Sequence, residues 1–212
     1  LGKMFNIELP MNFNSPYKAC SVKELWQRWH MTLSRFFIQY VYIPLGGNRV
    51  SKGRYIFNIF VVWALTGIWH GANWTFILWG LMYFVLIALE KFTGFDKKLG
   101  YFSHVYTMFF VIMGWVLFRA PNVADAFCYY KAMFGVGVPL IDGSTVAYIN
   151  QGFVYFIIAM VFSIPVFRKF DEKYRDKTVW NVVYTGFSLI ILFLSLTFIF
   201  NNSYSPFLYF NF

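Results

Sequence analysis

His70 is the residue of this chain whose type and surroundings could do chemistry. The ranges on either side of it, 56–65 and 74–82, are apolar enough for lipid. An ionisable side chain is costly to bury in a membrane, so such a residue marks a functional site by default. An imidazole is largely neutral at neutral pH and can accept a proton. The chemistry that fits is general-base catalysis, in which a positioned base contributes about 10²–10⁴ in rate.

His30 is a second candidate, on a predicted amphipathic helix. Ser21 and Glu24 have the spacing of a capping box, which predicts a helix from Ser21 to about Tyr40. Its polar residues form one stripe, including Glu24 and Arg28, which are spaced to form a local pair. His30 falls on the apolar side, whereas an interfacial helix normally keeps an imidazole on its wet face. Either His30 is a hydrogen-bonded core or headgroup-level residue, or it faces the same cavity as His70.

A basic cluster formed by Arg49, Lys52 and Arg54 follows a turn at 44–48, where a proline and two glycines must break any helix. The backbone N–H groups of such a turn could bind a phosphate, with the three basic side chains beside it. The alternative is a tight cytoplasmic turn that carries positive-inside residues. Taken alone, the sequence favours the second interpretation.

The element that must position His70 is a helical hairpin. Residues 55–90 are apolar except for the segment 66–73. One helix of that length would be too long for a bilayer core of about 30 Å, but two helices that meet near His70 fit. Gly71 is the predicted break, and Gly67 and Gly71 share a face, which predicts close helix approach. A break inside a membrane must line protein or a water-filled cavity, because its freed backbone groups need partners.

The composition identifies a membrane protein. The chain has 212 residues, of which 59% are hydrophobic, 24% aromatic and only 13% charged. The net charge of +9 could indicate nucleic acid, but the basic residues lie in short segments beside apolar runs. That pattern is typical of loops at an anionic membrane surface, so we expect membrane lipid and no nucleic acid as a partner.

Three further membrane spans are predicted, at about 105–118, 153–167 and 182–200. The positive-inside rule places the basic segments in the cytoplasm and the less basic segment 119–152 outside. The cytoplasmic segments are then 49–54, 91–98 and 168–177. The fold class we expect is all-α, a polytopic transmembrane protein with an interfacial amphipathic helix and a broken helical hairpin.

Residues 1–212 are expected to form one unit. The chain begins at Leu1 with neither an initiator Met nor a signal peptide, so we expect a fragment of a longer protein. Cys20 and Cys128 lie far apart, with neither metal-ligand spacing nor a disulfide framework, which predicts isolated structural thiols and no metal site.

Several motifs resemble the membrane-bound O-acyltransferase (MBOAT) family. The resemblance is closest to the bacterial branch that includes the alginate O-acetylation protein and its relatives acting on peptidoglycan and other exopolysaccharides. The motifs span almost the whole chain, which corresponds to the C-terminal portion of such a protein. They are Pro16-Tyr17, Trp26-x-Arg28-Trp29-His30, Tyr42-Ile43-Pro44-Leu45-Gly46-Gly47-Asn48-Arg49, Gly67-Ile68-Trp69-His70-Gly71-Ala72, Trp79-Gly80, residues 114–120 and residues 206–210.

The resemblance implies that His70 matches the near-invariant histidine of the family and that His30 matches a second motif histidine. It implies acetyl transfer from a cytoplasmic thioester, acetyl-CoA, to a hydroxyl of an extracytoplasmic polysaccharide, directly or through a partner protein, across the bacterial inner membrane. No permanently bound cofactor is expected, and the basic cluster would attract the phosphates of acetyl-CoA. His30, Thr66, Asn73 and the freed N–H groups near Gly71 are candidates to stabilise the developing oxyanion.

Three alternatives remain. D-alanyl transferases of teichoic acid modification share the Arg-Trp-His element, but we expect them to diverge at residues 44–49, which favours acetyl transfer. The chain could instead be a non-catalytic conduit or assembly subunit, because polar residues in membranes also mark pathways. A secondary transporter would share the broken helix but should contain an internal repeat. The sequence contains no convincing repeat.

Overall fold

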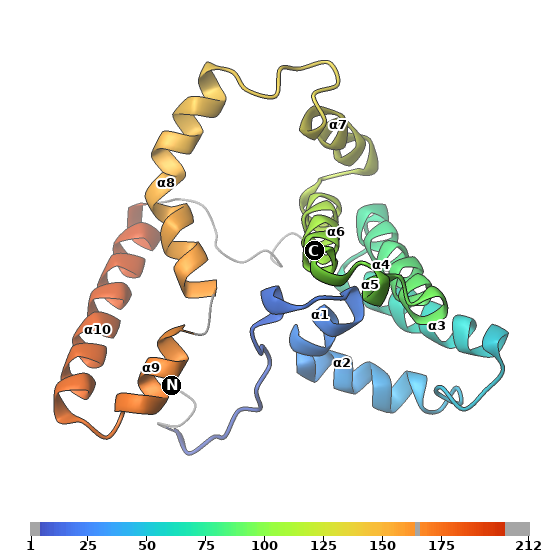
Figure 1. Cartoon of the computed structure of the whole chain (residues 1–212), viewed down its shortest axis with the longest axis horizontal. Helices are drawn as coiled ribbons and strands as arrows, with labels where there is room; N and C mark the ends of the chain where they lie inside the picture. Colours follow the sequence, from blue (N-terminus) through green and yellow to red (C-terminus); the bar gives the residue numbers. More distant parts are fainter. Residues whose placement is uncertain (1–4, 164–165, 202–212) are drawn as a thin grey trace. The chain divides into compact units, whose positions relative to one another are not determined.

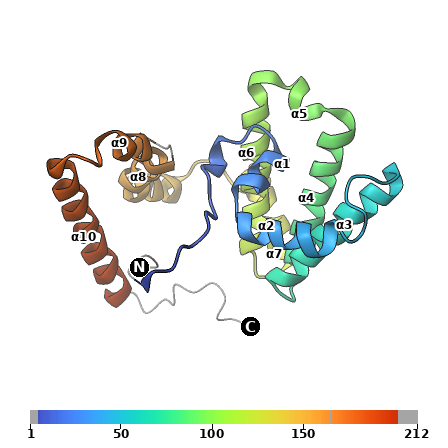
Figure 2. The same ribbon diagram turned by 90° about the horizontal axis from the view of Figure 1, so that it is seen from below.

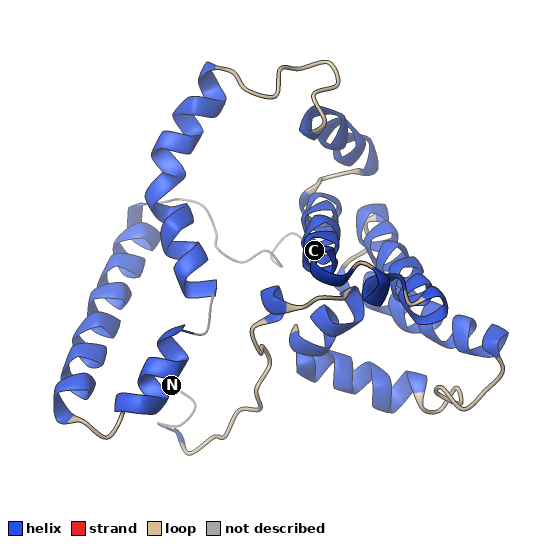
Figure 3. Cartoon of the chain, in the orientation of Figure 1, coloured by secondary structure: helices blue, strands red, loops and turns tan. Residues whose placement is uncertain are grey.

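The computed structural model describes residues 5–163 and 166–201, and every regular element within them is a helix or helical turn (Figure 3). Four of these helical segments are long and apolar enough to cross a membrane: Trp74–Thr93, Gly100–Arg119, Gly143–Ser163 and Thr178–Thr197. The protein is therefore an all-α, multi-pass membrane protein, as predicted. The helical elements are η2 (Pro16–Lys18), α1 (Val22–Arg28), α2 (Met31–Phe37), η3 (Ile38–Tyr42), α3 (Lys52–His70), α4 (Trp74–Thr93), α5 (Phe95–Lys98), η4 (Gly100–Phe102), α6 (Ser103–Arg119), α7 (Val123–Met133), α8 (Gly143–Ser163), α9 (Val166–Tyr174) and α10 (Thr178–Asn201).

The chain divides into two compact units, Leu1–Val154 and Tyr155–Phe212. The first contains α1 to α7 (Figure 1). The second contains α9 and α10, and the boundary between the units falls within α8. Within the second unit, the indole N–H of Trp180 donates to the carboxylate of Asp171 at 3.1 Å. The third predicted span is confirmed as α10, and the motif at 206–210 lies outside the described residues.

The break in the predicted hairpin is confirmed. The helix α3 ends at His70, and α4 begins at Trp74. Gly71 between them has φ 149°, a conformation that glycine adopts without the penalty of a Cβ. Asn73 then caps α4, since its side-chain oxygen accepts the N–H of Thr75 at 3.2 Å. Local sequence alone therefore ends one helix and starts the next beside His70.

The two helices of the hairpin approach closely at two glycines, but not at the predicted pair. A Cβ built on Gly67 would lie 2.7 Å from the backbone oxygen of Phe76, and one built on Gly80 would lie 2.5 Å from that of Trp63. Gly71 was predicted to share this contact with Gly67. The close approach is confirmed at Gly67, but Gly71 ends α3, and Gly80 of α4 is the second glycine at the contact.

The predicted helix from Ser21 to Tyr40 is broken in two. The Ser21 cap is confirmed, because its hydroxyl accepts the N–H of Glu24 at 3.0 Å. The helix α1 stops after seven residues, and α2 starts at Met31. Between them His30 has φ 47° and ψ 52°, the left-handed conformation. Propensity favoured one continuous helix, but contacts with the segment before α1 replace the helical hydrogen bonds at this point.

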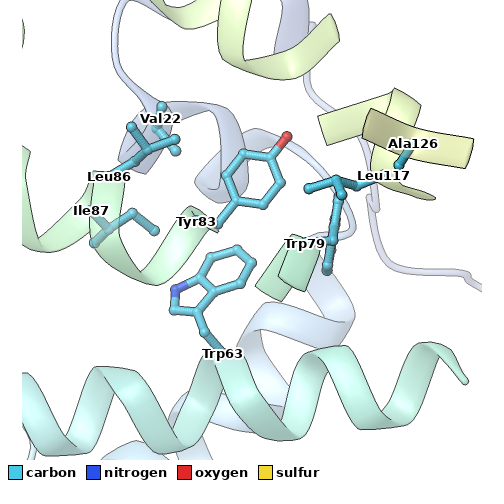
Figure 4. Packing of buried hydrophobic residues seen from close by; sticks show 8 residues of the cluster. All are labelled: Val22, Trp63, Trp79, Tyr83, Leu86, Ile87, Leu117 and Ala126. Carbon is cyan, nitrogen blue, oxygen red and sulfur yellow. The ribbon is translucent and has the colours of Figure 1, made fainter. Parts of the chain in front are cut away.

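The core of the first unit lies between α1, α3, α4 and α6. Figure 2 shows α4 and α6 side by side, with α5 joining them at one end. The ring of Trp26 on α1 packs edge-on against three others, with centroid distances of 5.2 Å to Trp63, 5.3 Å to Trp79 and 4.9 Å to Tyr83. Figure 4 shows Trp63 of α3 beneath Tyr83 of α4 in this cluster. Aromatic packing therefore fixes α1 against the hairpin.

Two other predictions need adjustment. The segment 119–152 contains α7 and the start of α8, which begins ten residues before the predicted span at 153. Cys20 and Cys128 are unpaired as predicted, but both are exposed.

Candidate functional site

His70 lies at the end of α3, enclosed by aromatic rings. Its side chain is 7% exposed. The ring centroid of the imidazole lies 4.9 Å from those of Trp69 and Trp79, 5.1 Å from Phe118 and 6.3 Å from Phe76. Its Nδ1 atom is buried and has no hydrogen-bond partner among the described residues. A nearly buried imidazole with an unpaired nitrogen can exchange a proton with a bound molecule.

His30 lies against the same tryptophan as His70. Its ring centroid is 5.9 Å from that of Trp69 and 6.4 Å from that of Phe13. The Nδ1 atom of His30 is also buried without a partner in the described part of the chain. The structure thus brings the two predicted histidines together around Trp69, while their catalytic roles stay predictions.

The strained backbone of His30 is held by a segment that precedes α1. The N–H of Asn14 donates to the carbonyl of Arg28 at 2.9 Å. The side-chain oxygen of Asn12 accepts both the N–H and the hydroxyl of Thr32, at 3.0 and 2.8 Å. A left-handed residue other than glycine costs about 1–3 kcal/mol and persists only where surrounding contacts fix it. Asn12 and Asn14 therefore position His30, and nothing in the local sequence around His30 indicated them.

Glu90 anchors the other end of α1. Its carboxylate accepts the backbone N–H groups of Val22 at 2.6 Å and of Lys23 at 2.9 Å, and its side chain is 6% exposed. The first N–H groups of a helix lack internal partners and favour a negative charge. The sequence did contain a signal for Glu90, since it is the one acidic residue in the apolar range 74–93. Together with Asn12, it fixes the element that carries His30.

The predicted basic cluster lies far from the histidines. Arg49, Lys52 and Arg54 are all exposed at the start of α3. At about 1.5 Å per residue, the first residue of α3 lies about 27 Å along the helix from His70. Arg54 also has a structural role, because its Nε donates to the side-chain oxygen of Asn58 at 3.1 Å. The structure therefore does not bring the cluster into the histidine site.

Asn58, which the sequence reasoning did not single out, closes the turn before α3. It is fully buried and donates to the carbonyls of Leu45 at 3.1 Å and Gly47 at 3.0 Å. A polar residue in the middle of an apolar helix was the available signal.

Three of the donors predicted to stabilise an oxyanion bond to other groups of the chain. The hydroxyl of Thr66 donates to the carbonyl of Val62 at 2.8 Å. The amide of Asn73 donates to Pro121 at 2.7 Å, and the N–H of Gly71 donates to Ile68 at 3.1 Å. The prediction therefore needs correction for these three donors, whereas the Nδ1 of His30 has no partner among the described residues and its role stays a prediction. Among the described residues, the buried donors without a partner include Trp26 Nε1 and Thr75 Oγ1.

The third histidine has a structural partner. His104 lies at the start of α6, and its Nδ1 is 3.1 Å from the carbonyl oxygen of Ala19, so that nitrogen carries the proton and donates. Phe118, which contacts His70, lies about 21 Å further along α6 at 1.5 Å per residue. In the part of the chain that the structure describes, no three His, Cys, Asp or Glu residues lie close enough to hold a metal ion.

Comparison with known proteins assigns this arrangement to a family. The model of the membrane-bound O-acyltransferase family matches residues 4–130, which include α1 to α6 and both histidines. The chain belongs to the membrane-bound O-acyltransferase family. No solved structure matches the chain.

Two relatives match across the whole chain, and a third matches part of it. A peptidoglycan O-acetyltransferase of Helicobacter pylori is 35% identical over 100% of this chain and 44% of its own length. A probable alginate O-acetylase of Pseudomonas putida is 34% identical over 100% of this chain and 48% of its own length. A teichoic acid D-alanyltransferase of Streptococcus thermophilus is 35% identical over 42% of this chain and 23% of its own length. The chain spans about half the length of the first two relatives.

Proposed function

We propose that this chain carries the acyl-transfer site of an O-acyltransferase that moves an acetyl group from acetyl-CoA to a hydroxyl outside the cytoplasm. The observation that carries the proposal is His70, a 7% exposed imidazole with an unpaired Nδ1 at a break between two helices. The family supports acyl transfer. The relatives named as O-acetyltransferase and O-acetylase match the whole chain and support acetyl as the group.

In the proposed reaction His70 is the general base. It takes the proton of the acceptor hydroxyl as the oxygen attacks the thioester carbonyl, a contribution of about 10²–10⁴ in rate. The carbonyl electron pair moves onto the oxygen, then returns as the carbon–sulfur bond breaks, and the thiolate takes the proton from His70. His30, across Trp69 from His70, orients the acceptor.

The basic cluster attracts the acyl donor, acetyl-CoA, without contacting the reacting carbonyl. Under the positive-inside rule the start of α3 faces the cytoplasm, so its exposed cations face the compartment of acetyl-CoA. Arg49 and Lys52 raise the local concentration of the polyphosphate donor through their field, rather than by contact at the reacting carbon. The acetyl group is then delivered along the hairpin to His70. The bacterial relatives support a location in the bacterial inner membrane as part of this proposal.

The acceptor is a polysaccharide hydroxyl, or the hydroxyl of an extracytoplasmic partner protein that passes the acetyl group on. The names of the whole-chain relatives, which refer to alginate and peptidoglycan, support a cell-envelope polymer. A second candidate is D-alanyl transfer to teichoic acid, which the match to the Streptococcus thermophilus protein supports over less than half of the chain.

The experiment uses the full-length protein, purified and reconstituted in liposomes with radiolabelled acetyl-CoA and a soluble polysaccharide acceptor on opposite sides. We expect label to appear in the polysaccharide, or in an extracytoplasmic protein supplied on the same side as the polysaccharide, and to stay in the donor with empty liposomes. A conduit or assembly subunit would move no label without another enzyme. Transfer of labelled D-alanine from its carrier thioester, with none from acetyl-CoA, would support the second candidate.

A further inference from the structure

Thr75 has a buried hydroxyl for which the described residues provide no partner. The side chain is 0% exposed, and its Oγ1 atom makes no hydrogen bond in the described part of the chain. Its backbone is accounted for, because the N–H donates to Asn73 at 3.2 Å. An unpaired buried hydroxyl is unfavourable, so such a group in a folded protein needs an explanation.

Other buried threonines of the chain show why Thr75 is different. Thr66 and Thr107 each donate to the carbonyl four residues earlier in the same helix, at 2.8 and 2.9 Å. Thr75 is the second residue of α4, so the carbonyl four residues earlier belongs to Gly71, outside the helix. Its position in the first turn therefore removes the partner that a threonine ordinarily finds in a helix.

Thr75 lies at the end of α4 that borders His70. Phe76 and Trp79, its neighbours at one and four residues, both contact the imidazole, with centroid distances of 6.3 and 4.9 Å. Residues four apart share one face of a helix, so Thr75 and Trp79 are on the same buried face. The proposed base, His70, and the unpaired hydroxyl of Thr75 thus both lie next to the break between α3 and α4.

We propose that Thr75 is a further catalytic residue, whose hydroxyl donates a hydrogen bond to the acyl carbonyl oxygen. This inference rests on the proposed acyl transfer at His70. As the acceptor oxygen bonds to the carbonyl carbon and its proton moves to His70, the carbonyl electron pair moves onto the oxygen. Thr75 stabilises that oxyanion and keeps its own proton. When the pair returns, the carbon–sulfur bond breaks and the thiolate leaves with the proton from His70.

The test is Thr75→Val in the full-length protein, because valine keeps the shape and removes the hydroxyl. We expect kcat for acetyl transfer to fall by about 10²–10³, as for loss of one oxyanion donor, with KM for acetyl-CoA nearly unchanged. Thr75→Ser restores the hydroxyl and should restore most of the rate. The melting temperature of Thr75→Val should not fall, because no hydrogen bond within the described chain is lost. The matched control, Thr107→Val, removes a paired buried hydroxyl on α6 and should keep the wild-type kcat.

A kcat for Thr75→Val within about threefold of wild type would overturn the inference, since one oxyanion donor supplies about 10²–10³. A lowered melting temperature with a rate loss that disappears on cooling would also overturn it, because the hydroxyl would then be structural. Transfer by wild type, together with no transfer by His70→Gln, would show that the proposed function holds. Either of the two results above would then rule out only the role of Thr75. If wild-type protein transfers no acetyl, the proposed function fails and this inference fails with it.

Discussion

Replacing Glu90 with leucine is expected to release the start of α1 from α4. The carboxylate accepts two backbone N–H groups, from Val22 and Lys23, at 2.6 and 2.9 Å. A hydrogen bond to a charged group contributes about 1.5–3 kcal/mol, so the loss of both lowers the free energy of unfolding by about 3–6 kcal/mol. Glu90→Gln keeps one acceptor oxygen, now uncharged, and its NH₂ group faces the second backbone N–H, so it should lose more than half as much. Because α1 leads into His30, acyl transfer should fall with stability.

The assay for Glu90 is thermal unfolding of the purified full-length protein in detergent, followed by acetyl transfer below the transition. With about 2–4 °C per kcal/mol, Glu90→Leu should lower the melting temperature by at least about 6 °C. The control is Glu24→Gln, which removes a partly exposed carboxylate whose pair with Arg28, at 2.8 Å, is local. Such pairs contribute about 0–1 kcal/mol, so this variant should shift the transition by less than about 4 °C. Equal melting of Glu90→Leu and wild type would refute the anchoring role.

Three further predictions follow from the geometry. Gly80→Ala places a Cβ 2.5 Å from a backbone oxygen of α3, so hairpin stability should fall by about 1–3 kcal/mol in thermal unfolding. The control is Gly53→Ala, which has open space around the new Cβ and should not destabilise the protein. Equal losses of stability in the two variants would contradict the close approach of the helices at Gly80. In single-cysteine variants in intact cells, a membrane-impermeant maleimide should label exposed Cys128, which lies in the segment predicted to be outside. It should not label exposed Cys20, because the neighbouring Ala19 bonds to His104, close to the predicted cytoplasmic segment 91–98. The reverse would contradict the predicted topology. The N–H of Cys20 and the guanidinium of Arg28 lower the pKa of Glu24 from its ordinary value of 4.5. The ionised Glu24 therefore contributes its full stabilisation of the fold above pH 4.5, and this contribution is lost as the pH falls toward the lowered pKa. Glu24→Gln should remove this part of the acid dependence of the melting temperature, and an unchanged dependence would contradict it.

Local signals in the sequence predicted the elements that form from neighbouring residues. The cap at Ser21 requires only Glu24, three residues later, and the end of α3 requires only the glycine at position 71. His70 could be identified because an ionisable group among apolar residues is informative by itself. These features depend on contacts within a few residues, which a single sequence displays.

The break at His30 and the placement of α1 depend on hydrogen bonds to residues that are distant in the chain. The break at His30 is stabilised by Asn12, whose side chain bonds to Thr32, 20 residues away. The start of α1 is held by Glu90, 68 residues from Val22. Amphipathic periodicity around residues 21–40 is compatible with one helix, and only these tertiary hydrogen bonds select two. A single sequence contains both residues of each such hydrogen bond but does not show which residues bond to each other.

The same limit applied to the donors of the site. Thr66 and Asn73 were plausible from their positions near His70, but each has a partner that only the folded chain reveals. Thr75 was not singled out, because its lack of a partner follows from its place in the first turn of α4. Whether a polar group is free is a property of packing rather than of sequence.

The central claim is that His70 is the general base of acyl transfer. The most direct measurement is the initial rate of acetyl transfer at saturating acetyl-CoA by reconstituted full-length protein, wild type against His70→Gln and His70→Ala. The control is His104→Gln, which changes a histidine that bonds to the Ala19 carbonyl away from the site. We predict that both His70 variants insert and fold but lose at least about 10² in rate, while the control keeps it. Folded His70 variants that transfer acetyl within a few-fold of wild type would contradict the account.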